Sequence, residues 1–321
     1  MANVMGNAMD NICLLLTSTF KFVIDPPLSI SQQNYLILPA ENQTVNPAFN
    51  ITSVNTSALS THLFINAGKQ GISFVELEKE SNTFISVIVY HFTKQLSCDD
   101  IAAAVNNIFA TDFFLQRNFN RVDITWCFNE SILVPSEFFE KSAAAGMLDM
   151  VYGDADDRSI KNQLVLKYNL YNSYRVAAAI ENTIINKFPH LHQSHQAALL
   201  IDFDAADKDL LYCNFYTDSL TVLLRKNGQL QVIQNFEFTT PEDAVYHLLN
   251  VCQSFEADAP QITLKASGMI DATSNLYNEL YKYFAAVSFT ALPGNFTYAE
   301  DINNYPAHYF SHLFATAACV L

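Results

Sequence analysis

Residues 210–238 read LLYCNFYTDSLTVLLRKNGQLQVIQNFEF, which is three β-rich runs separated by two short breaks. The second break is Asn227-Gly228, and Asn-Gly between two such runs is the strongest short-range signal of a β-hairpin. The first break is the turn Tyr216-Thr217-Asp218-Ser219. The stretch therefore predicts a three-stranded antiparallel meander.

A helix is expected directly after this meander. Thr240 can cap its N-terminus, Pro241 stands at its first position, and Glu242 and Asp243 lie in its first turn. Further on, the sequence predicts a strand at Ile262–Ala266, a helix near Leu276–Phe284 and a strand at Ala286–Phe289. The order of elements is that of an α/β domain with a mixed sheet, antiparallel in the meander and parallel through the helical crossovers.

The same order occurs about 150 residues earlier. β-rich runs at His62–Ile65, Ile72–Leu77 and Phe84–Phe92 precede a helix capped by Ser97 and a strand at Val122–Cys127. The rest of this unit carries helices near 136–148 and 180–188. Two related α/β domains are therefore expected, at residues 59–209 and 210–321, after an N-terminal extension at residues 1–58.

Composition narrows the class of protein. A chain of 321 residues with 50% hydrophobic content can bury two cores, and its net charge of −15 argues against nucleic acid as a partner. No apolar run reaches the roughly 18 residues of a membrane span, and the N-terminus lacks a basic signal-peptide region, so a cytoplasmic location is expected. Six scattered cysteines without a CxxC motif predict free thiols.

Three runs of the sequence resemble, in this order, an uncharacterised bacterial family, a domain of unknown function with an actin-like ATPase fold. The runs are THLFINAGKQGISFVEL (61–77), VLLRKNGQLQVIQNFEFTTPEDAVYHLLN (222–250) and ITLKASGMI (262–270). The similarity extends from about Thr61 to the C-terminus. It implies the α/β architecture of actin-like ATPases, in which two ribonuclease-H-like domains with mixed five-stranded sheets hold ATP between them.

The resemblance also implies three segments that contact nucleotide. In actin-like ATPases, the first turn of each domain usually carries Asp-x-Gly, because the carboxylate organises Mg²⁺ and glycine lets backbone N–H groups approach phosphate. The first turn here has Asn66 in place of the aspartate, the second keeps Asp218 but has no glycine, and the adenosine segment has Ser267 in place of one glycine. The candidate cofactor-binding residues are Asn66, Gly68, Lys69, Gly71, Thr217, Asp218, Ser219, Ser267 and Gly268.

These departures favour a protein that is not an enzyme. Eight glycines in 321 residues are few for a chain with phosphate-binding loops. The predicted function is a non-catalytic or weakly nucleotide-binding actin-like protein that acts through protein partners, with no cofactor or with weakly bound ATP and Mg²⁺. A homo-oligomer is a further option.

The alternative is an ATPase or sugar-kinase-like phosphotransferase that uses the cleft between the domains. In it, Asp218 organises the metal and Lys69 contacts phosphate. An Asp218 side chain turned away from the cleft, or Tyr216 in the phosphate position, would argue against this alternative.

Other clusters have simpler readings. His190, His192 and His195 could bind a divalent metal, but a polar strand end explains them better because no carboxylate partner is identifiable. His308 and His312 lie four residues apart on an expected C-terminal helix, where packing accounts for them. A final cluster reads as a charged face or linker rather than an acid–base pair, and consists of Asp202, Asp204, Asp207 and Asp209. No metal site and no catalytic residue are predicted.

Overall fold

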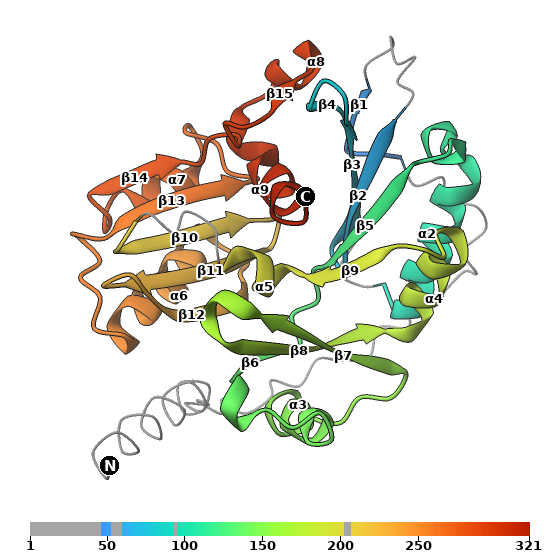
Figure 1. The fold of residues 1–321 in the computed structure, drawn as a ribbon. Helices are drawn as coiled ribbons and strands as arrows, with labels where there is room; N and C mark the ends of the chain where they lie inside the picture. The colour runs from blue at the N-terminus through green and yellow to red at the C-terminus, as the bar shows by residue number, and fades with distance from the viewer. Residues whose placement is uncertain (1–45, 53–59, 93–95, 202–206) are drawn as a thin grey trace, which may run out of the picture.

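The computed structural model describes residues 46–52, 60–92, 96–201 and 207–321, and it contains two large mixed β-sheets with helix α9 (Ala307–Cys319) between them (Figure 1). We call the sheet of residues 210–289 with its helices the second lobe, and the remaining two sheets with their helices the first lobe. Residues 1–45 and 53–58 of the expected N-terminal extension lie outside the described residues. Within the described ranges, no helix has the length and apolarity needed to cross a membrane.

The large sheet of the first lobe has the strand order β1-β4-β3-β2-β5-β9, and β15 also pairs with β4. The pairs β2–β3 and β3–β4 are antiparallel, whereas β2–β5 and β5–β9 are parallel, so the sheet is mixed as expected. Its strands are β1 (Phe49–Thr52), β2 (Thr61–Gly68), β3 (Gly71–Glu78), β4 (Thr83–His91), β5 (Arg121–Trp126), β9 (His192–His195) and β15 (Thr297–Tyr298). Five of these form the expected sheet, and β1 and β15 extend it by two strands at the β4 edge.

Both faces of this sheet are buried. Successive side chains of a strand point to opposite faces, and every residue of β2 is buried. Leu63 and Ile65 face α2 (Cys98–Thr111) and α4 (Ala178–Lys187). Phe64, one residue from each, belongs to the core formed with α9. A helix from the C-terminal end of the chain therefore covers the second face of the first-lobe sheet.

The second lobe has the expected five-stranded mixed sheet, in the order β12-β11-β10-β13-β14. Asn227 and Gly228 both have positive φ, at 53° and 77°, which the hairpin between β11 and β12 requires. Helix α6 begins after Thr240 with a reciprocal capping box to Asp243. The elements are β10 (Leu210–Phe215), β11 (Ser219–Lys226), β12 (Gln229–Glu237), α6 (Pro241–Ser254), β13 (Thr263–Gly268), α7 (Asn275–Leu280) and β14 (Ala286–Phe289).

A third, antiparallel sheet lies within the first lobe, below the large sheets in Figure 1. It has the order β6-β8-β7, and the buried Arg175 of β8 donates a hydrogen bond of 2.9 Å to the carbonyl of Gly153, the C-cap of α3. The helix expected at residues 136–148 is wrong at its start, because the α-helix begins only at Ala144. The remaining elements are β6 (Ser131–Pro135), α3 (Ala144–Tyr152), β7 (Arg158–Val165), β8 (Leu170–Ala177), α5 (Gln196–Leu200) and α8 (Glu300–Asn303).

Candidate functional site

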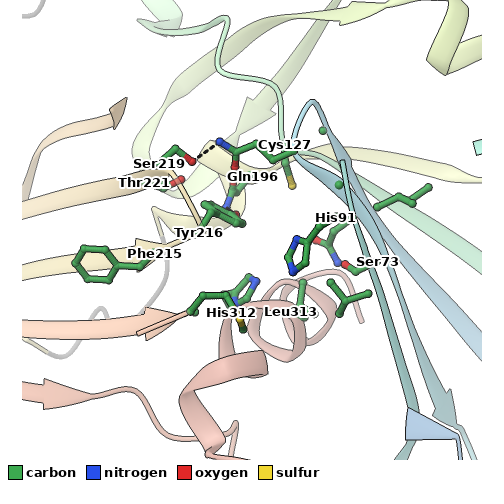
Figure 2. Close-up of a pocket in the computed structure, with 18 of the residues that line it drawn as sticks. Ser73, His91, Cys127, Gln196, Phe215, Tyr216, Ser219, Thr221, His312 and Leu313 are labelled. Atoms are coloured by element: carbon green, nitrogen blue, oxygen red, sulfur yellow. Dashed lines mark hydrogen bonds between the residues drawn. The ribbon is translucent and has the colours of Figure 1, made fainter. Parts of the chain in front are cut away.

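A pocket of about 850 Å³, including its open mouth, lies where the two lobes meet (Figure 2). One wall comes from the β2–β3 turn and the ends of β4 and β5. The opposite wall comes from the β10–β11 turn and the end of β13, and α9 and the first residue of α5 complete the lining. The pocket is therefore built from the segments to which the sequence resemblance assigned nucleotide contacts.

The lining carries no formal charge. It consists of glycines, apolar and aromatic side chains, amides, hydroxyls, one thiol and two imidazoles, without a single Asp, Glu, Lys or Arg among the described residues that line it. Of the nine candidate residues, five belong to the lining: Asn66, Gly68, Gly71, Ser219 and Gly268. The other four are Lys69, Thr217, Asp218 and Ser267. The structure therefore brings the candidate amide and glycines to the pocket, but not the candidate cation and carboxylate.

The glycines of the first turn are required by neighbouring strands. A Cβ atom on Gly71 would lie 2.3 Å from the carbonyl oxygen of Tyr90 in β4, and one on Gly68 would lie 2.8 Å from that of Cys127 after β5. Real Cβ atoms do not come so close to backbone atoms, so a larger residue would force these strands apart. Lys69, between the two glycines in the sequence, is exposed.

Asn66 is the polar side chain of this turn that enters the pocket. It is 7% exposed, and its Oδ1 accepts a hydrogen bond of 3.2 Å from the Thr316 hydroxyl of α9. Its Nδ2 atom has no hydrogen-bond partner among the described residues. A buried donor of this kind is unusual in a folded protein.

The second turn is closed by backbone and side-chain contacts. The backbone N–H of Tyr216 donates to the Ser219 carbonyl at 2.8 Å, and the Tyr216 hydroxyl accepts a 3.0 Å bond from Gln196 of α5. Tyr216 and Ser219 line the pocket, whereas Thr217 is exposed. Asp218 is half-buried beside the pocket and is not part of the lining.

Gln70 joins the two turns across the lobes. Its side-chain amide donates to the Ser219 hydroxyl, the bond drawn as a dashed line at Ser219 in Figure 2, and reaches Asp218 Oδ1 at 3.5 Å. The resemblance to actin-like ATPases implied that phosphate and metal would lie between these turns. Here a neutral amide of the chain bridges them.

The two candidate residues of the expected adenosine segment have different surroundings. Ser267 is fully buried and its hydroxyl bonds to the Ser311 hydroxyl at 2.8 Å, so this side chain is directed to α9. Gly268 has a φ of +80°, and a Cβ atom there would lie 2.1 Å from the Phe215 carbonyl oxygen. Only glycine suits this position, with or without a ligand.

Burial keeps the titratable groups of the pocket uncharged. It lowers the pKa of His312 to about 3 and also lowers the pKa of His91, and both rings point into the pocket (Figure 2). Burial raises the pKa of the Cys127 thiol to about 12 and raises that of Tyr216 as well. At neutral pH the pocket is therefore lined by neutral groups.

The alternative metal clusters of the sequence are not assembled. Among the described residues, no group of three His, Cys, Asp or Glu side chains could hold a metal ion. His195 is instead the N-cap of α5, with Nδ1 accepting from the Ala197 N–H at 3.2 Å and Nε2 donating to the Phe128 carbonyl. Asp207 pairs with Lys265 at 2.7 Å, and Asp209 accepts from the Asn227 N–H; Asp202 and Asp204 lie outside the described residues.

Sequence reasoning did not find Gln70, Gln196 or Thr316 as residues of the site. Each meets its partner across the fold, and Gln70 is 149 positions from Ser219 in the sequence. A local signal existed only for Gln70, which lies in the β2–β3 turn next to Lys69.

Comparisons with known proteins agree with this architecture. The sequence model of a family described as "Protein of unknown function (DUF3822)" matches residues 51–287, and none of the curated proteins matches. A Bacteroides thetaiotaomicron protein with an actin-like ATPase fold and unknown function is similar at 20% identity and a TM-score of 0.66, over 78% of this chain and 97% of that one. A chain of the PilM-PilN type IV pilus biogenesis complex is similar at 9% identity and a TM-score of 0.53, over 81% and 98%. The actin-like ATPase fold implied by the sequence resemblance is confirmed.

Proposed function

The chain belongs to the DUF3822 family of proteins of unknown function, and we propose that it is an actin-like protein that does not hydrolyse ATP and acts by binding protein partners. The observation that carries this proposal is the Gln70 bridge between the two turns, above a pocket without a lining carboxylate. The protein would then have the fold of an actin-like ATPase without catalysing ATP hydrolysis.

The residues present do not fit a magnesium nucleotide. Mg²⁺ is held through carboxylates, phosphates and water, and the half-buried Asp218 beside the pocket already accepts a hydrogen bond from Gln70. A triphosphate carries several negative charges, and the lining offers no lysine or arginine to compensate them. Binding of Mg-ATP would therefore require the Gln70 bridge to break without a charged group to replace it.

Action through partners is suggested by one similar structure, a chain of the PilM-PilN type IV pilus biogenesis complex. A two-lobed protein without a reaction of its own can still present its lobes to other proteins.

The competing function is an ATPase or a sugar-kinase-like phosphotransferase. It needs Asp218 to organise a metal and Lys69 to contact phosphate, but both lie outside the lining and Lys69 is exposed. Tyr216 instead lines the pocket close to where the second turn would hold phosphate. These positions favour the proposed function over the competing one.

Calorimetric titration with Mg-ATP and a phosphate-release assay test the proposal. We expect no turnover and no binding tighter than about 100 μM, because the pocket lacks compensating charge. Gln70→Ala removes the bridge and is expected to remain without turnover, and Gln253→Ala, at an exposed glutamine of α6, is the matched control. Turnover by the unmodified protein that is lost on Asp218→Asn would establish the competing enzyme instead.

A further inference from the structure

The interlobe pocket contains a buried hydrogen-bonding group that the fold leaves unused. Asn66 is more than nine-tenths buried and lines the pocket. Its Oδ1 is occupied by Thr316, so its Nδ2 is the donor that remains, and it has no partner among the described residues. Buried donors without partners cost free energy, which a ligand with an acceptor atom would recover.

A second unused group lies on α9. The Nδ1 atom of His312 is buried and has no hydrogen-bond partner among the described residues. Its ring meets the ring of Tyr216 edge to face, at 6.0 Å between centroids, which fixes its orientation in the pocket. The two unused groups come from different elements of the pocket wall, β2 and α9.

The remaining lining favours an uncharged ligand with apolar surface over a charged one. Apolar and aromatic residues contribute, with the Tyr216 ring beside that of His312, and the lining holds no acidic or basic side chain. A charged ligand would lose its hydration without gaining an ion pair.

We propose that this pocket binds an uncharged, ring-bearing small molecule that offers a hydrogen-bond acceptor to Asn66 and a second polar atom to His312. The inference rests on the proposed function, because it assumes that the cleft does not take a magnesium nucleotide. The proposed ligand carries no phosphate group and needs no metal ion. Such a ligand contacts β2 and α9 at the same time.

Ligand-observed NMR with matched neutral and anionic probes tests the ligand class. The probes are adenosine and uridine against their 5′-monophosphates, and nicotinamide against nicotinate. We expect at least one neutral member to bind below about 5 mM and at least about tenfold more tightly than its anionic partner. Equal or tighter binding of the anions, or no binding by any neutral probe, would overturn the proposal.

Two variants tie the binding to the named groups. Asn66→Asp keeps the size and the oxygen but replaces the donor with a charged acceptor, and we expect about tenfold weaker binding of the neutral probe. Asn106→Asp makes the same change at an exposed position of α2 and is expected to alter binding by less than about twofold. His312→Phe keeps a ring without its nitrogens and is expected to weaken binding severalfold, which serves if Asn66→Asp fails to fold. Unchanged binding in a folded Asn66 or His312 variant would remove the assignment.

The outcomes separate this inference from the proposed function. ATP turnover would refute the proposed function, and the inference that rests on it would fall with it whatever the neutral probes show. No turnover and no neutral-probe binding would refute the assignment alone.

Discussion

The β2–β3 turn at Gly68–Gly71 and the β10–β11 turn at Tyr216–Ser219 occupy equivalent places in two meanders of the same topology, yet they differ in what holds them. The first turn keeps glycines because the backbones of Tyr90 and Cys127 come too close for any larger residue. The second has no glycine, and side chains close it, with Tyr216 bonded to Gln196 and Ser219 bonded to Gln70. Glycines in such a turn therefore do not by themselves indicate phosphate binding, since strand packing requires them here.

The largest expected effect tests how far the first lobe depends on a helix from the C-terminal end. Phe314 of α9 is fully buried against Phe84 and Tyr298 on the first-lobe sheet. Phe314→Ala should lower the free energy of unfolding by about 4 kcal/mol, because it removes a large core side chain and leaves a cavity. Chemical denaturation measures this loss.

The control for this prediction is Phe113→Ala. Phe113 is 84% exposed, so its truncation should change the free energy of unfolding by less than about 0.5 kcal/mol. If Phe314→Ala lowered the free energy of unfolding as little as Phe113→Ala does, packing of α9 on the first-lobe sheet would contribute little to stability.

The next prediction compares glycines within the second lobe. Gly268 and Gly228 both have positive φ, but only Gly268 lies against backbone, since a Cβ atom on Gly228 would meet nothing within 4 Å. Gly268→Ala should cost about 3 kcal/mol or more, from strain and steric overlap together. Gly228→Ala should cost only about 1 kcal/mol, from strain alone. Thermal unfolding of the two variants measures the difference, and equal losses would mean that close approach at Gly268 has no energetic weight.

The third prediction concerns the segment that connects the lobes. Burial lowers the pKa of His195 to about 4, and its Nδ1 must stay unprotonated to accept from the Ala197 N–H. Because the unfolded chain binds this proton below about pH 6.5, the stability is fully present above that pH and is lost as the pH falls toward 4. From pH 7 to pH 5, His195 should account for a loss of about 2 kcal/mol.

His195→Asn isolates this contribution. Asparagine is a good N-cap and does not titrate, so the variant should lose about 2 kcal/mol less than the unmodified protein over the same pH interval. Urea denaturation at pH 7, 6 and 5 gives the two slopes. Parallel slopes would show that His195 is not the group that responds to acid in this segment.

Local sequence signals predicted much of the fold because they act over a few residues. The Asn227-Gly228 hairpin and the capping box of Thr240 with Asp243 are set by neighbouring backbone, and the structure has both. The direction of Ser267 toward α9 and the Gln70 bridge depend on segments that meet only in the folded chain. Their sequence neighbourhoods contain no periodicity or spacing that encodes such contacts, so neither the bridge nor the neutral lining could be predicted from the sequence.

The smallest expected effect concerns the contact that joins the two turns. Gln70→Ala removes its hydrogen bond to the Ser219 hydroxyl, and one neutral hydrogen bond contributes about 1 kcal/mol to the free energy of unfolding. Gln253→Ala, at an exposed glutamine, should change it by less than about 0.5 kcal/mol.

The sharper readout for Gln70→Ala is the separation of the turns rather than the overall stability. Hydrogen exchange at residues 216–219 and small-angle scattering should report faster exchange at the second turn and a larger radius of gyration, because the remaining contacts let the lobes move apart. Gln70→Glu should open them further, since it places a carboxylate beside Asp218. If both variants left exchange at the second turn unchanged, the two turns would each be held within their own lobe, and the cleft would be closed by α9 instead of by Gln70.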